Sequence, residues 1–148
     1  MKLGKKMRIL LVEDQPSTVR LVREALKENG EGHHLSVAKD GEEAMGFLHR
    51  QGDYARAPRP DLILLDLSLP KKDGREVLAE IKSDDDLKRI PVVILAASDM
   101  EKDIINAYNS YANCYVTKPI HLEGFIEVIK SIENFWFKIV KLPPKREE

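Results

Sequence analysis

The sequence predicts an α/β domain in which helices cover both faces of a parallel β-sheet. Short apolar runs without polar alternation recur along the chain, which is typical of strands buried on both faces. Segments with helical periodicity separate these runs, and this alternation of strand and helix favours a parallel sheet. With 148 residues, 43% of them hydrophobic, the chain has enough apolar material for one such core.

Five strands are predicted where the apolar runs occur. In chain order the runs are Ile9–Val12, Leu35–Ala38, Leu62–Leu65, Val92–Ala97 and Tyr115–Val116. Leucine and β-branched residues dominate them, and these residue types suit strands that are covered on both sides.

A helix is expected after each strand. The expected starting points are Ser17, Asp40, Gly74, Ser98 and about Leu122. Capping boxes open the second and fourth helices. The first helix should end near Gly30, where a C-terminal stop is typical, and the third at Ser83. The last should run to about Val140, with its apolar residues on one broad face.

The remaining segments are expected outside this core. Residues 1–6 form a basic leader and residues 141–148 a flexible tail, which leaves 7–140 for a single domain. Residues 51–60 are rich in Gly, Pro and charge, so an exposed inserted loop is expected before the third strand.

Charge, cysteine content and hydropathy exclude several classes of protein. The formal net charge is −1, so no overall field favours nucleic acid or an anionic membrane. Cys114 is the only cysteine, which excludes an internal disulfide and a zinc site built on several thiolates. The apolar run that follows the basic leader, Met7–Val12, is too short for a signal peptide or a membrane span. A reducing cytoplasmic location is expected.

Three acidic residues directly follow two of the predicted strands. Glu13 and Asp14 follow the first strand, and Asp66 follows the third. The carboxyl ends of parallel strands form the binding crevice, and right-handed crossovers would make these strands neighbours. Clustered carboxylates repel unless a cation neutralises them, and Mg²⁺ is the obvious candidate for oxygen ligands. An aspartate in such a site can attack a phosphoryl group and form an aspartyl phosphate.

A positive charge is expected at the same edge. Lys118 follows the fifth strand, where its ammonium group could pair with Asp66 or with phosphate oxygens. Phosphoryl transfer needs in-line positioning and neutralised oxygens, which Mg²⁺ and one lysine provide. Pro119 raises the chance of a cis peptide bond that directs the lysine, although most such bonds are trans.

Taken together, these motifs resemble the receiver domain of bacterial-type two-component response regulators. The resemblance rests, in this order, on Glu13-Asp14, Asp66, Pro70, Gly74 and Lys118-Pro119. The runs 66–78 and 113–118, with the late Phe135-Trp136, look most like the small single-domain regulators of phytochrome-type sensor kinases. The resemblance implies a CheY-like, flavodoxin-like sheet of strand order 2-1-3-4-5 with five helices.

The resemblance also implies a role for each site residue. Asp66 would accept a phosphoryl group from a sensor histidine kinase in a Mg²⁺-dependent reaction. Asp14 and Asp66 would ligate Mg²⁺ directly and Glu13 through water, and the backbone carbonyl of Ser68 would complete the protein ligands. Tyr115 matches the aromatic residue whose rotamer reports phosphorylation. The domain would assist its own phosphorylation and dephosphorylation without being an enzyme.

The end of the fourth strand departs from the family pattern. Counting back from Lys118, Ala96 stands where the family usually has a Ser or Thr that donates to a phosphoryl oxygen, and Ala97 follows it. Such a charge-assisted hydrogen bond contributes about 1.5–3 kcal/mol. Phosphorylation is therefore expected to persist while the conformational response weakens roughly tenfold or more.

Other functions stay open at this point. A pseudo-receiver that keeps the fold but ignores phosphate is supported by Ala96. An aspartyl-phosphate hydrolase would need a second Asp two residues after Asp66, where Ser68 stands. A flavin carrier of the same fold would need a glycine- and hydroxyl-rich phosphate loop after the first strand, where acids stand instead.

Output is expected through protein contacts, because no output domain follows the predicted receiver. By resemblance, the face made by the fourth helix, fifth strand and fifth helix often mediates dimers, so an isologous homodimer is expected there. Phe135, Trp136 and Phe137 exceed what one helix face normally hides. Partner contact and core packing are both open explanations for these aromatic residues.

Overall fold

The structure is a computed structural model that describes residues 6–27, 33–97, 99–118 and 122–144. Within these ranges five strands alternate with five α-helices. The strands are β1 (Arg8–Val12), β2 (His34–Ala38), β3 (Leu62–Asp66), β4 (Val92–Ala96) and β5 (Cys114–Thr117). The helices are α1 (Pro16–Lys27), α2 (Gly41–Leu48), α3 (Gly74–Ser83), α4 (Glu101–Asn109) and α5 (Leu122–Asn134). Three short helical turns are η1 (Gly52–Tyr54), η2 (Leu87–Arg89) and η3 (Phe135–Ile139).

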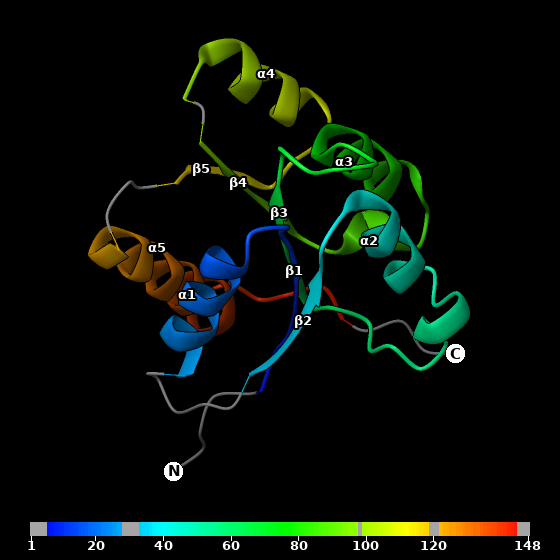
Figure 1. Cartoon of the computed structure of the whole chain (residues 1–148), viewed down its shortest axis with the longest axis horizontal. Helices are drawn as coiled ribbons and strands as arrows, with labels where there is room; N and C mark the ends of the chain where they lie inside the picture. The colour runs from blue at the N-terminus through cyan, green and yellow to red at the C-terminus, as the bar shows by residue number, and fades with distance from the viewer. Residues whose placement is uncertain (1–5, 28–32, 98, 119–121, 145–148) are drawn as a thin grey trace.

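The strands form one parallel sheet in the order β2-β1-β3-β4-β5, which confirms the predicted flavodoxin-like topology. Figure 1 shows α1 and α5 on one face of the sheet and α2, α3 and α4 on the other. Val12 pairs with Leu65 and Leu65 with Ile94, so β1, β3 and β4 end within two residues of one another. The residues that follow these strands are therefore brought to one edge.

Each face of the sheet has its own apolar core, because side chains alternate along a strand. The core beneath α2 and α3 contains Leu10, Val12, Ile63, Leu65, Val77, Leu78 and Ile81. The core beneath α1 and α5 contains Ile9, Leu11, Leu62, Leu64, Val22, Phe125 and Ile129. All of these side chains are buried. This explains why the strand sequences lack polar alternation.

The second helix begins where its capping box predicts. The Asp40 side chain accepts a hydrogen bond from the Glu43 amide at 2.8 Å, and Glu43 in turn accepts one from the Lys39 amide at 3.0 Å. The fourth helix differs from prediction, since it begins at Glu101 and Met100 occupies its N-cap position. Ser98, the predicted cap, lies outside the described residues.

Other boundaries also shift. Strand β4 ends at Ala96 instead of Ala97, while β5 extends beyond the predicted pair to include Cys114 and Thr117. Hydrogen bonding to a neighbouring strand, which an apolar run does not reveal, sets these limits. The first helix is described to Lys27, and its predicted end near Gly30 lies outside the described residues.

The last helix changes to π-helical geometry at Phe135. Trp136 and Phe137 pack against the core beneath α1 and α5, and the Phe137 ring lies 4.9 Å from the His33 ring. Phe135 remains 50% exposed. Two of the three consecutive aromatic residues therefore pack inward, and the third remains half-exposed.

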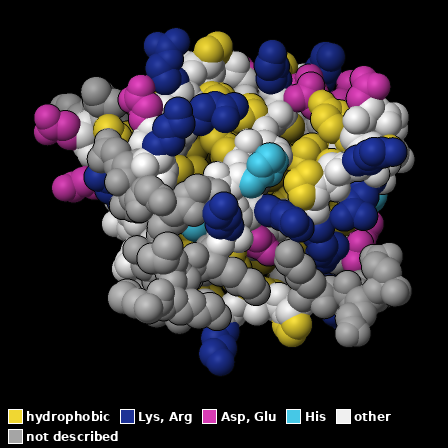
Figure 2. All heavy atoms as spheres, turned by 90° about the horizontal axis from the view of Figure 1, so that it is seen from below, with side chains coloured by type: hydrophobic (Ala, Val, Ile, Leu, Met, Phe, Trp, Pro, Cys, Tyr) yellow, Lys and Arg dark blue, Asp and Glu magenta, His cyan; other side chains and the backbone are white. Residues whose placement is uncertain are grey.

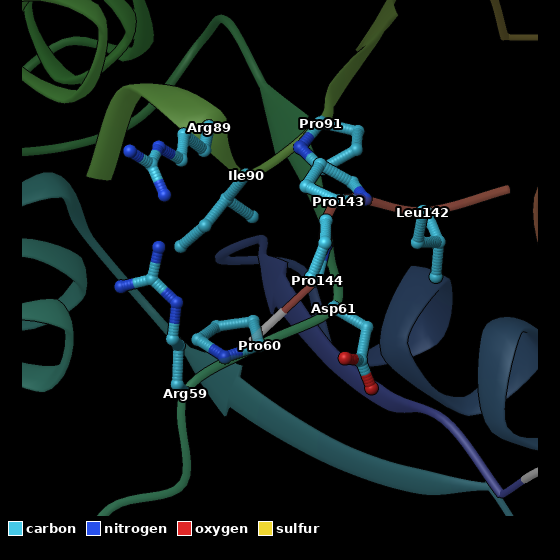
Figure 3. Close-up of a pocket in the computed structure, with 9 residues that line it drawn as sticks. All are labelled: Arg59, Pro60, Asp61, Arg89, Ile90, Pro91, Leu142, Pro143 and Pro144. Carbon is cyan, nitrogen blue, oxygen red and sulfur yellow. The ribbon is translucent and has the colours of Figure 1, made fainter. Parts of the chain in front are cut away.

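The opposite edge, where the strands begin, has a different character. Figure 2 shows Lys and Arg side chains gathered on this face. A small cavity of about 30 Å³ lies among Arg59, Pro60, Ile90, Pro91 and the segment Leu142–Pro144 (Figure 3). Asp61, which also lines it, accepts a hydrogen bond from the Arg8 amide at 2.8 Å. Among the described residues, no helix has the length and apolar character required to cross a membrane.

Candidate functional site

The side chains of Glu13, Asp14 and Asp66 gather at the carboxyl edge of the sheet. One oxygen atom from each carboxylate lies within 4.8 Å of the other two. Glu13 and Asp14 directly follow β1, and Asp66 is the last residue of its neighbour β3. Glu13 is fully buried and Asp66 is only 6% exposed, whereas Asp14 is open to solvent. Two carboxylates of the acidic cluster, those of Glu13 and Asp66, are therefore buried, and the third, that of Asp14, is accessible to solvent.

Lys118 reaches this cluster from the end of β5. Its Nζ atom donates to Glu13 Oε1 at 2.9 Å and to Asp66 Oδ2 at 3.1 Å. The Lys118 backbone amide donates to the Ala96 carbonyl at 2.7 Å, which prolongs the ladder between β4 and β5. That bond fixes the point from which the side chain extends across β4 toward β3.

Backbone amides hold the carboxylates in place. The Gln15 amide donates to Glu13 Oε2 at 3.2 Å, and the Ser68 amide donates to Asp66 Oδ1 at 3.1 Å. Both are turns in which a side chain binds the amide two residues further on. Each carboxylate is thus oriented by the loop that follows its own strand.

Burial and charge shift the proton affinity of this site. Burial, reinforced by the negative charge of Asp66, raises the pKa of Glu13 from 4.5 to about 7, although Lys118 opposes the shift. Burial alone would lower the pKa of Lys118, but the hydrogen bonds and charges of Glu13 and Asp66 outweigh it and hold the pKa above its usual range. The lysine is consequently charged, and one lysine does not fully compensate three acids.

The donor set fits a hard divalent cation. Carboxylate oxygens are the ligands such ions prefer, and the excess of negative charge gives the cation an electrostatic reason to bind. The exposure of Asp14 leaves room for the water molecules that Mg²⁺ retains. Ser68, two residues beyond Asp66, is exposed beside the cluster, where its backbone could supply one more oxygen.

The other predicted site residues lie around this cluster. Ala96 ends β4 and is 3% exposed, and it pairs in register with Thr117 of β5, while Ala97 is exposed. Tyr115 is half-buried against the core beneath α2 and α3. Pro119 lies outside the described residues.

One residue near the site was not predicted from the sequence. The Tyr115 backbone amide donates to the Tyr108 hydroxyl of α4 at 3.2 Å, which links α4 to β5. Tyr108 is 48% exposed, and no pattern in the sequence separates it from an ordinary surface tyrosine.

A groove of about 400 Å³ opens beside the acidic cluster. Its lining includes two acids of the cluster, Glu13 and Asp14, and three cationic residues, Arg20, Arg23 and Lys39. These cations lie on α1 and just after β2, so positive charge lies close to two of the carboxylates.

Comparisons with known proteins agree with this geometry. A family model described as the response regulator receiver domain matches residues 9–130. Response regulator Rcp1 of Synechocystis sp. is 54% identical over 135 residues, which cover 91% of this chain and 92% of Rcp1. The crystal structure of the phosphorylated cyanobacterial phytochrome response regulator RcpA has a TM-score of 0.91 at 51% identity, covering 95% of this chain and all of that one. The Mn²⁺-bound form of Rcp1 has a TM-score of 0.89 at 53% identity, covering 93% of this chain and 99% of the other.

Proposed function

Because the chain belongs to the response regulator receiver family of two-component signalling, we propose that Asp66 is its phosphoacceptor. The observation that carries this proposal is the convergence of Asp66, Glu13, Asp14 and Lys118 on one edge of the sheet. Asp66 lies beside both other acids and receives Lys118, and unlike the fully buried Glu13 it keeps a small exposed fraction of 6%. Its carboxylate is largely buried and lies within 4.8 Å of that of the solvent-exposed Asp14.

The phosphoryl donor in this proposal is a phosphohistidine of a sensor histidine kinase. A carboxylate oxygen of Asp66 forms the new bond to phosphorus while the phosphorus–nitrogen bond of the donor breaks, and the departing imidazole takes a proton from solvent. Lys118 pairs with a phosphoryl oxygen and offsets the charge that Asp66 has gained.

The proposed metal is Mg²⁺, held directly by Asp14 and Asp66, through water by Glu13, and by the backbone carbonyl of Ser68. When bound, it neutralises the repulsion between the carboxylates and offsets charge on the phosphoryl oxygens. The three clustered carboxylates support this assignment, and Rcp1 has been crystallised in a Mn²⁺-bound form. A carbonyl ligand does not depend on side-chain identity, so Ser68 suits this role as well as Asn would.

The conformational response involves Ala96, Ala97 and Tyr115. Ala96 has no hydroxyl group to bind the phosphoryl oxygen, so we expect phosphorylation at Asp66 with a reduced response at Tyr115. The presence of all three acids and the lysine argues against a pseudo-receiver that ignores phosphate.

We propose that the receiver domain comprises residues 7–140 and that the protein is located in the cytoplasm. It would act as a phosphoacceptor rather than as an enzyme with a separate substrate. Its kinase is proposed to be phytochrome-type, because RcpA is a phytochrome response regulator and is 51% identical. Output would pass through protein contacts, without nucleic acid, and through a homodimer formed by α4, β5 and α5. Exposed Ile105 and Tyr108 on α4 support an interface there.

The proposal is tested by incubating the full chain with acetyl phosphate and Mg²⁺ and measuring intact mass. One phosphoryl group should be added to the wild-type chain and to Asp85→Ala, a control acid that is 97% exposed, but not to Asp66→Ala. A wild-type chain that gains no phosphoryl group would contradict the proposal. A phosphoryl group added to Asp66→Ala would show that another residue is the acceptor. Continuous release of phosphate without a stable adduct would instead favour a hydrolase.

A further inference from the structure

The loop that follows Asp66 packs against the first turn of α2 with no room for a side chain. A Cβ atom placed on Gly41 would lie 2.0 Å from the Lys72 carbonyl oxygen and 2.6 Å from the Lys72 Cβ. The nearest obstacle is backbone, which cannot turn aside as a flexible side chain can. The φ angle of Gly41 is not in the left-handed region, so the close approach alone requires glycine here.

Two lysines also attach this loop to neighbouring helices. Lys71 Nζ lies 3.7 Å from Asp40 Oδ2, and the other carboxylate oxygen of Asp40 caps α2. Lys72 Nζ is hydrogen bonded to Glu80 of α3. The segment from Leu67 to Asp73 is therefore held against α2 on one side and α3 on the other.

The other end of the same loop lies in the acidic site. The Ser68 amide binds Asp66 Oδ1 at 3.1 Å, and the Gly74 amide closes the loop on the Leu67 carbonyl at 3.0 Å. Because the loop is short and closed, a displacement at Lys72 has few bonds over which to relax before it reaches Ser68.

We propose that Gly41 is a positioning residue for the metal site, although it contacts no carboxylate of the cluster. Its missing side chain lets Lys72 rest on α2, and this contact sets where the Ser68 carbonyl lies relative to Asp66. The inference rests on the proposed function, because it assigns that carbonyl to the Mg²⁺ ligand set. Gly41 does not touch the reacting atoms and acts only through the loop.

The chain offers a matched control in the same helix. A Cβ atom at Gly46 would lie 3.7 Å from the Tyr54 ring, which is ordinary van der Waals contact. Gly41→Ala and Gly46→Ala thus add the same methyl group to α2, but only the first collides with the loop.

The test is calorimetric titration of the full chain with Mg²⁺, with an unfolding curve recorded for each variant. Gly41→Ala should weaken Mg²⁺ binding about tenfold or more, while Gly46→Ala should stay within about twofold of wild type. A folded Gly41→Ala protein with wild-type affinity would overturn the inference and leave the proposed function intact. A wild-type chain that does not bind Mg²⁺ would overturn both.

A measurement on the wild-type chain decides the matter if Gly41→Ala does not fold. In a ¹⁵N-labelled sample titrated with Mg²⁺, the amide resonance of Gly41 should move with the same dissociation constant as that of Ser68, while that of Gly46 stays unchanged. A Gly41 resonance that does not respond to Mg²⁺ would show that the contact is not coupled to the metal site, and the inference would be wrong.

Discussion

Lys118 Nζ lies 2.9 Å from Glu13 Oε1, although 105 positions separate the two residues in the sequence. The sheet order explains the contact, because Lys118 follows β5 and reaches across β4 to the site that β1 and β3 share. The fully buried Glu13 therefore has a cationic partner in the absence of metal. This pair determines how the site should respond to mutation, to pH and to Mg²⁺.

Replacing Lys118 with Met should destabilise the metal-free protein. Loss of one partner from a buried ion pair costs about 3–5 kcal/mol, and the lower end applies here because the Lys118 side chain is 19% exposed. Mg²⁺ should recover part of this loss, because it supplies positive charge to the same carboxylates. Denaturant unfolding with and without Mg²⁺ measures both effects. Equal stabilisation of wild type and variant by Mg²⁺ would contradict the prediction.

The stability of the metal-free protein should depend on the protonation of Glu13. The pKa of Glu13 rises from 4.5 to about 7 on folding, so the folded chain binds the proton more tightly than the unfolded chain. The contribution of Glu13 to stability is therefore fully present below pH 4.5 and lost as the pH rises through 7. The neutral Glu13→Gln variant lacks this dependence.

The comparison of these two proteins isolates the effect of Glu13. Between pH 5 and pH 8 without Mg²⁺, wild type should lose about 2–3 kcal/mol of unfolding free energy relative to Glu13→Gln. Saturating Mg²⁺ should shrink the difference, because the ion favours the charged carboxylate. A difference that does not change with pH would show that Glu13 titrates near its ordinary value.

Introducing a hydroxyl group at position 96 should strengthen the response to phosphorylation. Ala96→Thr supplies a donor at the end of β4, beside the strand that carries Asp66, and a hydrogen bond of this class contributes about 1.5–3 kcal/mol. The change in the Tyr115 environment on adding beryllofluoride and Mg²⁺, followed by NMR, should be larger in the variant. Equal and complete changes in both proteins would refute the role assigned to Ala96.

Alanine substitutions at two helical glycines should have opposite effects. A Cβ atom on Gly74 would lie 2.3 Å from the Asp66 carbonyl oxygen and 2.6 Å from the Leu67 Cα, so Gly74→Ala must displace the backbone next to the phosphoacceptor. We expect lower stability and slower phosphorylation by acetyl phosphate. Gly46→Ala meets ordinary contacts and should stabilise the protein by about 0.5–1 kcal/mol. Thermal unfolding of both variants measures these opposite changes in stability. Equal shifts of the two melting temperatures relative to wild type would contradict the prediction.

Much of the fold and the main residues of the site could be predicted from the sequence. Buried parallel strands need continuous apolar runs, and those runs mark β1, β3 and β4 almost to the residue. Because parallel strands deliver their carboxyl ends to one edge, acids placed after β1 and β3 and a lysine placed after β5 imply a shared site. The strand positions and the main site residues can be predicted because each depends on residues that are adjacent in the sequence.

Other features were decided only by tertiary packing. The raised pKa of Glu13 depends on the complete burial of its side chain, and the fit of Gly41 against Lys72 depends on how the β3–α3 loop lies on α2. The π-helical turn at Phe135 and the bond from the Tyr115 amide to Tyr108 likewise depend on what surrounds them. Local propensity carries no information on such contacts, because they join segments distant in the chain and form only when the helices have packed on the sheet.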